Sequence, residues 1–413
     1  MNILWLSHLI PYPPKGGVLQ RSYNMIKELS KYHDVHLLAF NQKDLIGPFY
    51  PSIDDALSDS KKNLSKFCNE VYFFDIPSDK NKLTKLWLAF RSVFTKEPYN
   101  INWLKSKKFE HFLESYLKNT SFDFVVFDTI SLILYFDLCS DIPSALDHHN
   151  IESHMLIRRA TKEDNFLKRW YFKQEGQRLK RYEKKFCPNY SFNFTCSSVD
   201  SQRLRELSPK STVETIPNGV DISYFYPWES TKDQDQTKSL IFAGTLSWYP
   251  NTEAVLFIAQ KIWPLLKQEA PDVVIDIIGA NPPPQIQQYA EQDPKFRVHG
   301  LVDDLRAMIN SATVYICPIF DGGGTKLKIL DALAMGKAII ATRLACEGIE
   351  VTNGLDVLFA ETPEEFATGV VELFSNTSAR KRLGHNARKL AEEKYSYTFI
   401  GKSLSVAIEK HSK

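Results

Sequence analysis

Short apolar runs rich in β-branched residues alternate with longer amphipathic segments along this chain of 413 residues. Strands separated by helices favour a parallel sheet, because parallel neighbours must be joined by a crossover. In the first half, the segments expected to form strands are Ile3–Leu6, Val35–Phe40, Val71–Phe74, Phe124–Phe127 and Ser144–Leu146, and the expected helices include Leu19–Tyr32 and Phe109–Leu117.

The second half repeats the pattern. Its expected strands are Leu240–Ala243, Val273–Ile278, Phe296–His299, Thr313–Cys317, Ala338–Ala341 and Val357–Phe359. Its expected helices lie near Glu253–Glu269, Asp303–Ser311, Lys328–Ala334, Pro363–Ser375 and Ser378–Glu393. Since the chain is also too long for one ordinary core, we expect an α/β fold with two parallel-sheet domains.

The boundary between these domains is expected where proline and glycine leave no room for a helix or strand. Ile216–Asp221 (IPNGVD) has this character, and the polar stretch Glu229–Ser239 follows it. The predicted domains are residues 1–215 and 216–395, with a final helix at 396–413 that returns to the first domain. Two such domains leave a cleft lined by the carboxyl ends of both sheets, where ligands of open parallel sheets bind.

Composition excludes several classes of protein. The six cysteines are scattered, with no CxxC pair or adjacent histidine cluster, so we expect free thiols in a reducing compartment and no structural zinc. The N-terminus lacks the features of a signal peptide, and the longest apolar run, Phe124 to Phe136, is interrupted by Asp128. We therefore expect a cytoplasmic protein that does not span a membrane. Neither domain has GxGxxG after its first strand, which disfavours an oxidoreductase.

A glycine-rich loop in the second domain is the strongest candidate ligand site. Asp321–Lys328 (DGGGTKLK) follows an expected strand and precedes a helix. Three glycines there expose backbone N–H donors at the positive end of a helix dipole, and Lys326 adds a charge where a diphosphate would lie. The alternative is a structural turn with a solvated lysine, although three glycines are costly to order without a ligand that approaches closely. The spacing is not that of Walker A.

Three further features are weaker individually. Asp331, near the start of the following helix, can accept hydrogen bonds from ribose hydroxyls, or can simply interact favourably with the helix dipole. Gly16 and Gly17 precede a helix and allow close approach of an anion or sugar, although an ordinary turn also needs glycine. In Asp147–Glu152 (DHHNIE), two adjacent histidines cannot both face one cleft, so at most one is functional, and an ordinary loop histidine is the alternative.

The order of these features resembles the family-4 glycosyltransferases of the GT-B fold, which have two Rossmann-like domains facing across a cleft. The resemblance runs from Asn2 to about Lys394. The matching segments are Gly16-Gly17, His149–Glu152, Ile216–Asp221, Phe242–Leu246, Ile277–Gly279, Val298–Val302 and Leu330–Gly336. Each is short, but seven in the right order make a chance match improbable.

The resemblance implies a role for several residues. Asp331 corresponds to the second acidic residue of the family's E-x7-E motif, which holds the ribose. His149 corresponds to the histidine that faces the reacting sugar, Val302 to the turn where the nucleobase is read, and Lys326 to a diphosphate ligand. The predicted catalytic residues are therefore His149 and Lys326. The predicted donor-binding residues are Gly16, Gly17, Gly244, Val302, Asp321, Gly323, Gly324, Thr325, Leu327, Lys328 and Asp331.

This chain departs from the family pattern at two places. Gly323 stands where many relatives have the first glutamate, so the acidic contact to the donor sugar is missing or comes from Asp321. The loop Gly244–Asn251 lacks the arginine and lysine that often neutralise the diphosphate, so Lys326, with Lys328, would have to replace them.

The resemblance implies a retaining hexosyltransferase that uses a nucleotide sugar, a UDP- or GDP-sugar, as its donor. The expected acceptor is a glycan or lipid-linked glycan in the synthesis of cell-surface polysaccharide. We expect no cofactor and no metal, since no Asp-x-Asp motif lies in a suitable loop. The alternatives are an inverting enzyme or nucleotide-sugar epimerase of the same fold, and a nucleotide-binding protein without catalysis.

Positive charge is concentrated in one segment. The net charge is +2, but His154–Lys185 alone holds 11 basic and 4 acidic residues, interleaved with aromatic and aliphatic ones. Such a segment can lie on an anionic inner membrane surface. The alternative is a solvated helix that packs its apolar stripe on the first domain. Nucleic acid is not expected as a partner, because no recognition motif accompanies the charge.

Overall fold

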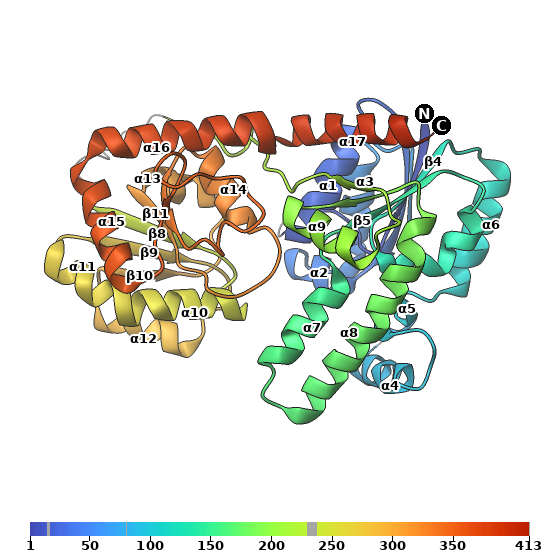
Figure 1. Ribbon diagram of the computed structural model, residues 1–413, viewed down its shortest axis with the longest axis horizontal. Coiled ribbons are helices and arrows are strands. Elements are labelled where there is room, and N and C mark those ends of the chain that lie inside the picture. The colour runs from blue at the N-terminus through green and yellow to red at the C-terminus, as the bar shows by residue number, and fades with distance from the viewer. Residues whose placement is uncertain (15–16, 80, 229–237, 413) are drawn as a thin grey trace. The chain divides into compact units, whose positions relative to one another are not determined.

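The structure is a computed structural model that describes residues 1–14, 17–79, 81–228 and 238–412. It divides into two compact units (Figure 1). The N-terminal unit comprises Met1–Pro217 with Ile400–Lys413, and the C-terminal unit comprises Asn218–Phe399. Most of the polar stretch expected after the boundary, residues 229–237, lies outside the described residues.

The N-terminal unit contains a seven-stranded parallel sheet in the order β3-β2-β1-β4-β5-β6-β7. Its strands are β1 (Asn2–Ser7), β2 (Asp34–Asn41), β3 (Glu70–Asp75), β4 (Phe124–Phe127), β5 (Ser144–His148), β6 (Phe192–Thr195) and β7 (Val213–Thr215). Its α-helices are α1 (Gly17–Leu29), α2 (Lys43–Ile46), α3 (Ile53–Leu64), α4 (Lys82–Ser92), α5 (Tyr99–Asn102), α6 (Lys107–Asn119), α7 (Glu152–Lys162), α8 (Phe166–Phe186) and α9 (Ser198–Leu207). Turns of 3-10 helix cover Gly47–Phe49, Ile130–Cys139 and Cys187–Asn189. The five expected strands are confirmed, and β6 and β7 are additional.

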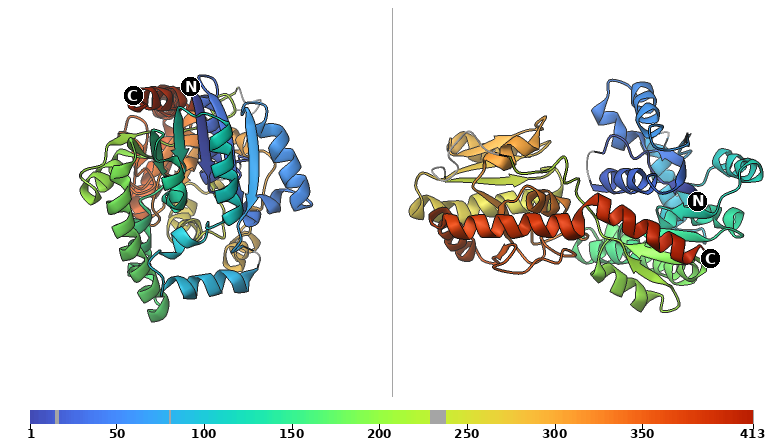
Figure 2. Two further views of the ribbon diagram at one scale, coloured as in Figure 1. Left: turned by 90° about the vertical axis from the view of Figure 1, so that its right-hand side faces the viewer. Right: turned by 90° about the horizontal axis from the view of Figure 1, so that it is seen from above.

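Helices cover both faces of this sheet (Figure 2). In β1, Leu4 and Leu6 belong to one apolar core, and Ile3 and Trp5 belong to the other. Successive strand residues point to opposite faces, so burial of both faces produces the continuous apolar run seen in the sequence. The last helix, α17 (Tyr397–His411), adds residues such as Ile400 to the second core.

The C-terminal unit contains a six-stranded parallel sheet in the order β10-β9-β8-β11-β12-β13, around one apolar core. All six strands were expected: β8 (Ser239–Ala243), β9 (Val274–Ile278), β10 (Phe296–His299), β11 (Val314–Cys317), β12 (Ala338–Ala341) and β13 (Leu358–Phe359). The α-helices are α10 (Tyr249–Phe257), α11 (Trp263–Glu269), α12 (Pro284–Gln292), α13 (Leu305–Ser311), α14 (Leu327–Ala334), α15 (Pro363–Ser375) and α16 (Thr377–Leu390). π-helical turns follow α10 at Ile258–Ile262 and α16 at Ala391–Tyr395.

The strand order locates the candidate sites in both sheets. Chain progression reverses between β1 and β4 in the first sheet, and between β8 and β11 in the second. Ligands of open parallel sheets bind beyond the carboxyl ends of strands at such a switch point. The candidate sites therefore lie among the residues that follow β1 and β4, and among those that follow β8 and β11.

Candidate functional site

In the C-terminal unit, the loop between β11 and α14 is folded around the Lys326 side chain. The Lys326 ammonium donates hydrogen bonds to the carbonyl oxygens of Gly322 at 2.8 Å and Gly324 at 2.9 Å. Both glycines have positive φ, +102° and +72°, which favours glycine at these positions. Glu347 lies 4.0 Å from the same ammonium. Lys326 therefore orders the glycine loop itself, and its predicted contact with a diphosphate stays a prediction.

Lys328 reaches the neighbouring loop, which follows β8. Its ammonium donates to Asn251 Oδ1 at 2.6 Å and lies 4.5 Å from the centre of the Phe242 ring. A side chain at Gly244 would collide with this ammonium and with the Asn251 amide unless both moved, so glycine suits this position. Burial lowers the pKa of Lys328 to about 8. The loop that lacks basic residues in sequence thus has a lysine ammonium beside it in the structure.

Asp331 lies one helical turn beyond Lys328 and is half-buried. The pKa of the Asp331 carboxyl is raised to about 7, because burial raises it by more than the nearby positive charge of Lys328 lowers it. Its carboxylate makes no hydrogen bond with any residue in the described ranges. Because carboxylate oxygens accept several hydrogen bonds, Asp331 has capacity for hydroxyl groups of a ligand.

The other residues predicted in this unit have more local environments. Asp321 is buried and accepts the Gly322 N–H at 2.6 Å. Val302, in the turn after β10, and Leu327, the first residue of α14, are half-buried and pack on the core. Gly323 is exposed and Thr325 is half-buried in the loop. The structure thus collects Gly244, Lys328 and Asp331 at the β8–β11 switch point.

In the N-terminal unit, a hydrogen-bonded pair that the sequence analysis did not identify occupies the switch point. His8 directly follows β1, and Asp128 directly follows β4. Asp128 Oδ1 is 2.8 Å from His8 Nδ1 and accepts the His8 backbone N–H at 2.9 Å. Asp128 Oδ2 accepts the Ser7 hydroxyl at 2.5 Å. The sequence feature that could have identified this pair is a polar residue immediately after each of two expected strands.

His149 lies beside this pair. The His8 and His149 rings meet edge to face with centroids 5.6 Å apart. Among the residues that the structure describes, the buried His149 Nε2 has no hydrogen-bond partner, and Asp147 lies 3.8 Å away. Burial lowers the pKa of His149 to about 4, so this ring is neutral near pH 7. The adjacent His148 points elsewhere, because its Nε2 pairs with Asn193 Oδ1 at 3.1 Å.

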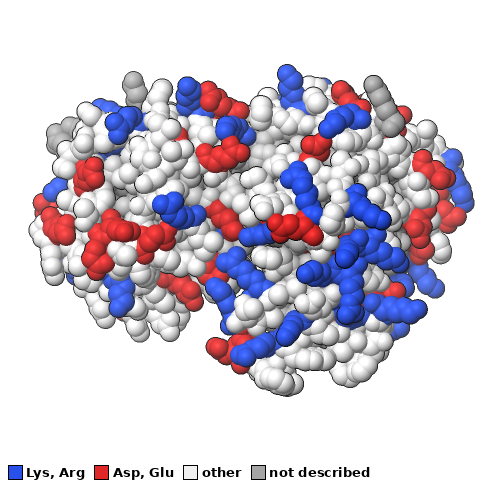
Figure 3. Space-filling view, in the orientation of Figure 1, with Lys and Arg blue, Asp and Glu red and all other residues white. Residues whose placement is uncertain are grey.

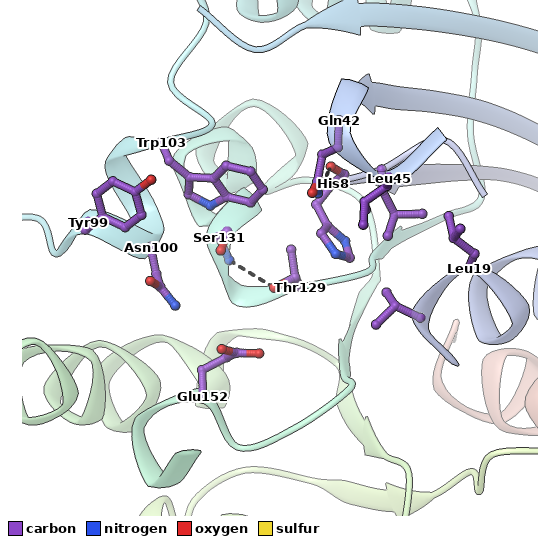
Figure 4. A pocket seen from close by; sticks show the side chains of 12 residues that line it. His8, Leu19, Gln42, Leu45, Tyr99, Asn100, Trp103, Thr129, Ser131 and Glu152 are labelled. Atoms are coloured by element: carbon purple, nitrogen blue, oxygen red, sulfur yellow. Dashed lines mark hydrogen bonds between the residues drawn. The ribbon is translucent and has the colours of Figure 1, made fainter. Parts of the chain in front are cut away.

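A pocket of about 560 Å³ opens beside His8 (Figure 4). Tyr99, Asn100 and Trp103 line one side, and Glu152, in the first turn of α7, lines another. Burial raises the pKa of Glu152 to about 7. Of the two predicted glycines near this region, Gly17 begins α1, whereas Gly16 lies outside the described residues.

One cluster within the described part of the chain has the ligand types of a metal site. Potential ligand atoms of His8, Asp128 and His149 lie within 4.8 Å of one another. Three protein donors already occupy the Asp128 carboxylate: the Ser7 hydroxyl, the His8 N–H and His8 Nδ1. Two members of the cluster, His8 and Asp128, are thus joined by hydrogen bonds in this structure.

Comparisons with known proteins agree with this geometry. Residues 237–376 match the family model described as "Glycosyl transferases group 1". The chain is 23% identical to an "Uncharacterized 44.6 kDa protein in cps region" of Klebsiella pneumoniae, over 98% of each chain. It is 30% identical to a phosphatidyl-myo-inositol mannosyltransferase of Mycolicibacterium smegmatis, over 31% of this chain and 34% of that protein.

Two solved structures share the whole architecture. Sucrose-phosphate synthase from Thermosynechococcus elongatus aligns over 99% of both chains, with a TM-score of 0.70 and 15% identity. The Anabaena protein HepE, in complex with UDP and glucose, aligns over 99% of this chain and 100% of that chain, with a TM-score of 0.65 and 14% identity. The similarity therefore extends over both units.

Proposed function

We propose that the C-terminal unit binds a nucleotide sugar and that the N-terminal unit binds the acceptor. The premise is that this chain is a group 1 glycosyltransferase with the GT-B fold. The observation that carries the donor assignment is the convergence of Lys328, Gly244 and Asp331 at the β8–β11 switch point. A cation, a close backbone approach and a carboxylate with free acceptor capacity match a diphosphate joined to a ribose.

The reaction breaks the bond between the anomeric carbon and the diphosphate, so negative charge develops on the leaving group. In our proposal, Lys328 and backbone N–H groups of the Gly323–Thr325 loop stabilise that charge, and Lys326 keeps the loop in shape. In other enzymes a divalent cation can neutralise the charge of the leaving diphosphate. In our proposal these positive groups do so, and the reaction needs no metal. UDP is the first nucleotide to test, since HepE was solved with UDP and glucose.

The donor assignment predicts which nucleotides stabilise the protein. The true nucleotide sugar should raise the melting temperature most within a panel, and excess EDTA should not reduce that shift. Asp331→Asn should weaken UDP and UMP alike, by about tenfold, because both carry the ribose and one hydrogen bond to a charged group is lost. Asp272→Asn, exposed before β9, is the matched control. Loss of affinity for UDP alone would reassign Asp331 to the diphosphate.

We propose transfer with retention at the anomeric carbon, as the resemblance implies. Inversion is a second candidate, favoured by one observation: His8 and Asp128 form a pair that can take up a proton from the acceptor. An NMR measurement of the anomeric configuration of the first-formed product separates the two.

We propose a glycan or lipid-linked glycan of cell-surface polysaccharide as the acceptor. Two relatives support this class: one is named for its place in a cps region, and the other is named as a mannosyltransferase acting on a phosphatidyl-inositol lipid. None of the helices within the described ranges is long and apolar enough to cross a bilayer.

The basic segment supports a contact with the cytoplasmic surface of an anionic membrane. Residues 154–185 form most of the helical hairpin of α7 and α8, over which blue side chains gather in Figure 3. At the start of α8, Phe166 and Leu167 are 74% and 72% exposed. Helix α4, at the same end of the unit in Figures 1 and 2, exposes five more large apolar residues, which are Leu83, Leu86, Trp87, Phe90 and, just beyond its end, Phe94.

An arginine attaches the end of α4 to the hairpin. Arg178 of α8 donates to the carbonyl oxygens of Ser92 at 2.7 Å and Glu97 at 3.0 Å, and also to that of Thr95. The exposed apolar side chains of α4 therefore belong to a fixed surface beside the basic hairpin. Apolar groups that enter the interface, with basic groups that face anionic headgroups, are the features of a peripheral membrane surface.

This surface predicts salt-sensitive sedimentation with vesicles of equal parts phosphatidylglycerol and phosphatidylcholine. Changing Arg158, Arg159, Lys168 and Arg169 together to glutamate should reduce binding at least tenfold, since each basic residue contributes about 1 kcal/mol. The matched control changes Lys61, Lys62, Lys107 and Lys108, which are exposed on α3 and α6, to glutamate. Equal loss in both variants would indicate a net-charge effect, and no binding by the unmodified protein would refute the contact.

A further inference from the structure

We propose that Asn251, in the first turn of α10, is a positioning residue that holds the Lys328 ammonium where the diphosphate of the donor binds. The proposal rests on the proposed function, because it concerns the same lysine and the same nucleotide. It deepens that function by assigning the orientation of the lysine to one neutral side chain, which lies 77 residues away in the sequence.

Two partners of opposite kind determine the orientation of the Asn251 amide. The residue is buried, with 6% of its surface exposed. Its Nδ2 donates to the backbone carbonyl oxygen of Thr245 at 2.8 Å, and its Oδ1 accepts from the Lys328 ammonium at 2.6 Å. Turning the amide over would set its NH2 group against the ammonium and its oxygen against the carbonyl, and both contacts would be repulsive. Asn251 therefore presents its oxygen to the lysine.

The backbone around Asn251 is ordered as well. The Asn251 N–H donates to the carbonyl oxygen of Trp248 at 2.9 Å. The preceding residue, Pro250, lies against the glycine loop, since a Cβ atom at Gly322 would be 3.3 Å from the Pro250 ring. The turn that holds Lys328 thus also contacts the loop whose N–H groups are proposed to bind the diphosphate.

The Lys328 ammonium has donors left for a ligand. An ammonium carries three N–H groups, and Asn251 Oδ1 is its one hydrogen-bond acceptor within the described ranges. The side chain is half-buried, and the Phe242 ring lies 4.5 Å from the ammonium on another side. Phosphate oxygens can therefore bond to the remaining N–H groups while the contact with Asn251 is kept.

Ordering the lysine in advance favours binding. A lysine side chain has four rotatable bonds, and a ligand that must immobilise a free lysine loses affinity. The hydrogen bond to Asn251 immobilises Lys328 before the ligand arrives. Asn251 thus acts on the diphosphate through Lys328, without a contact of its own.

The neutrality of Asn251 preserves the charge of the lysine. A carboxylate in its place would pair with the ammonium and compete with the diphosphate for it, whereas an amide oxygen orients the ammonium without compensating its charge. Of the charged groups nearby, Lys326 in the glycine loop is positive, and Asp331 of α14 has a pKa raised to about 7 by burial. The Cys317 thiol of β11 stays neutral, because burial raises its pKa to about 11.

The test compares two substitutions that keep the approximate shape of asparagine and change its chemistry in opposite ways. Asn251→Asp adds a carboxylate, which favours the charged lysine and raises the pKa of Lys328. Asn251→Leu removes the acceptor and lowers that pKa. In the wild-type protein the Kd for UDP should rise above about pH 8, as Lys328 loses its proton. This rise should move to higher pH in Asn251→Asp and to lower pH in Asn251→Leu, by on the order of one pH unit.

At pH 7 both variants should bind UDP about three- to tenfold more weakly than the wild-type protein. Aspartate offsets the charge of the lysine, and leucine no longer holds it. The matched control is Asn310→Asp in α13. Asn310 is buried, and its backbone carbonyl accepts from the ammonium of Lys337, whose pKa burial also lowers to about 8. The control makes the same change beside another buried lysine, and it should alter neither the affinity for UDP nor its pH dependence.

Two results would overturn the proposal. If Asn251 has only a structural role, the two variants weaken UDP binding without moving the rise in opposite directions. If Asn310→Asp moves the rise and Asn251→Asp does not, the pH dependence belongs to Lys337.

A second measurement does not depend on either variant folding. NMR titration of 15N-labelled lysine ammonium groups, assigned with Lys328→Met, gives the pKa of Lys328 directly. Saturating UDP should raise that pKa in the wild-type protein, because phosphate favours the charged lysine, and an unchanged pKa with UDP bound would overturn the proposal. If the wild-type protein binds no member of the nucleotide-sugar panel, the proposed function itself fails, which is distinct from a nucleotide that binds without affecting Lys328.

Discussion

Replacing Arg21 with methionine is expected to lower the free energy of unfolding by about 3–5 kcal/mol, because it leaves a buried carboxylate without its counter-charge. Arg21 projects from α1, and its side chain is 1% exposed. Its guanidinium donates to both oxygens of the fully buried Asp147, at 3.0 and 2.8 Å. It also donates to the carbonyl oxygens of Ile216 and Pro217, both at 3.1 Å. One side chain therefore connects α1, β5 and the segment after β7.

Urea unfolding of the full chain measures this loss. The double variant Arg21→Met/Asp147→Leu should recover much of it, since a well-packed apolar pair can replace a buried ion pair at little net change in stability. Lys118→Met removes an exposed ion pair with Glu114 on α6 and should change stability by less than about 1 kcal/mol. A loss below that value for Arg21→Met would show that Asp147 is neutral or hydrated in the folded protein.

Several of the strands that the sequence revealed have residues that are apolar on both faces. β1 and β8 are of this kind, because each lies in the middle of its sheet with cores or helices on both sides. β6 was missed because its sequence, FNFT, is only four residues long and is not a continuous apolar run like those of the other central strands. Asn193 is nevertheless fully buried, since it donates to the Cys187 carbonyl at 2.8 Å and pairs with His148. A buried polar network thus gave a core strand the appearance of a loop.

Some residues of the candidate sites are neighbours in the sequence, whereas others are brought together only by the pairing of strands. The glycine loop and Asp331 stand out in the sequence because the turn, the lysines and the helix are consecutive. The position of Lys328 beside Asn251, 77 residues away, depends on how β8 and β11 pair. His8 and Asp128 are 120 residues apart and meet because β1 and β4 are neighbours. Polar residues after adjacent parallel strands are therefore predictable as a site only once strand order is known.

Lys328→Met is expected to weaken binding of UDP by about 10- to 150-fold, the equivalent of one charge-assisted contact of roughly 1.5–3 kcal/mol. The lysine lies beside Gly244, and together with Asn251 it occupies the space that a side chain at that position would fill. UMP binding should fall less, since it carries one phosphate. Lys261→Met, an exposed lysine in the π-helical turn after α10, is the control and should leave both affinities unchanged.

The pH dependence of binding separates a contact with the diphosphate from a purely structural role of Lys328. Burial lowers the pKa of this ammonium from its ordinary 10.5 to about 8, so it is charged below pH 8 and loses its proton above it. A bound diphosphate favours the charged form, so the Kd for UDP should rise as pH increases beyond about 8 in the wild-type protein. The same rise should be absent from Lys328→Met, whose affinity is already low at neutral pH. A parallel rise in both proteins would place the titrating group elsewhere, and the diphosphate contact would then have to come from Lys326 and the glycine loop.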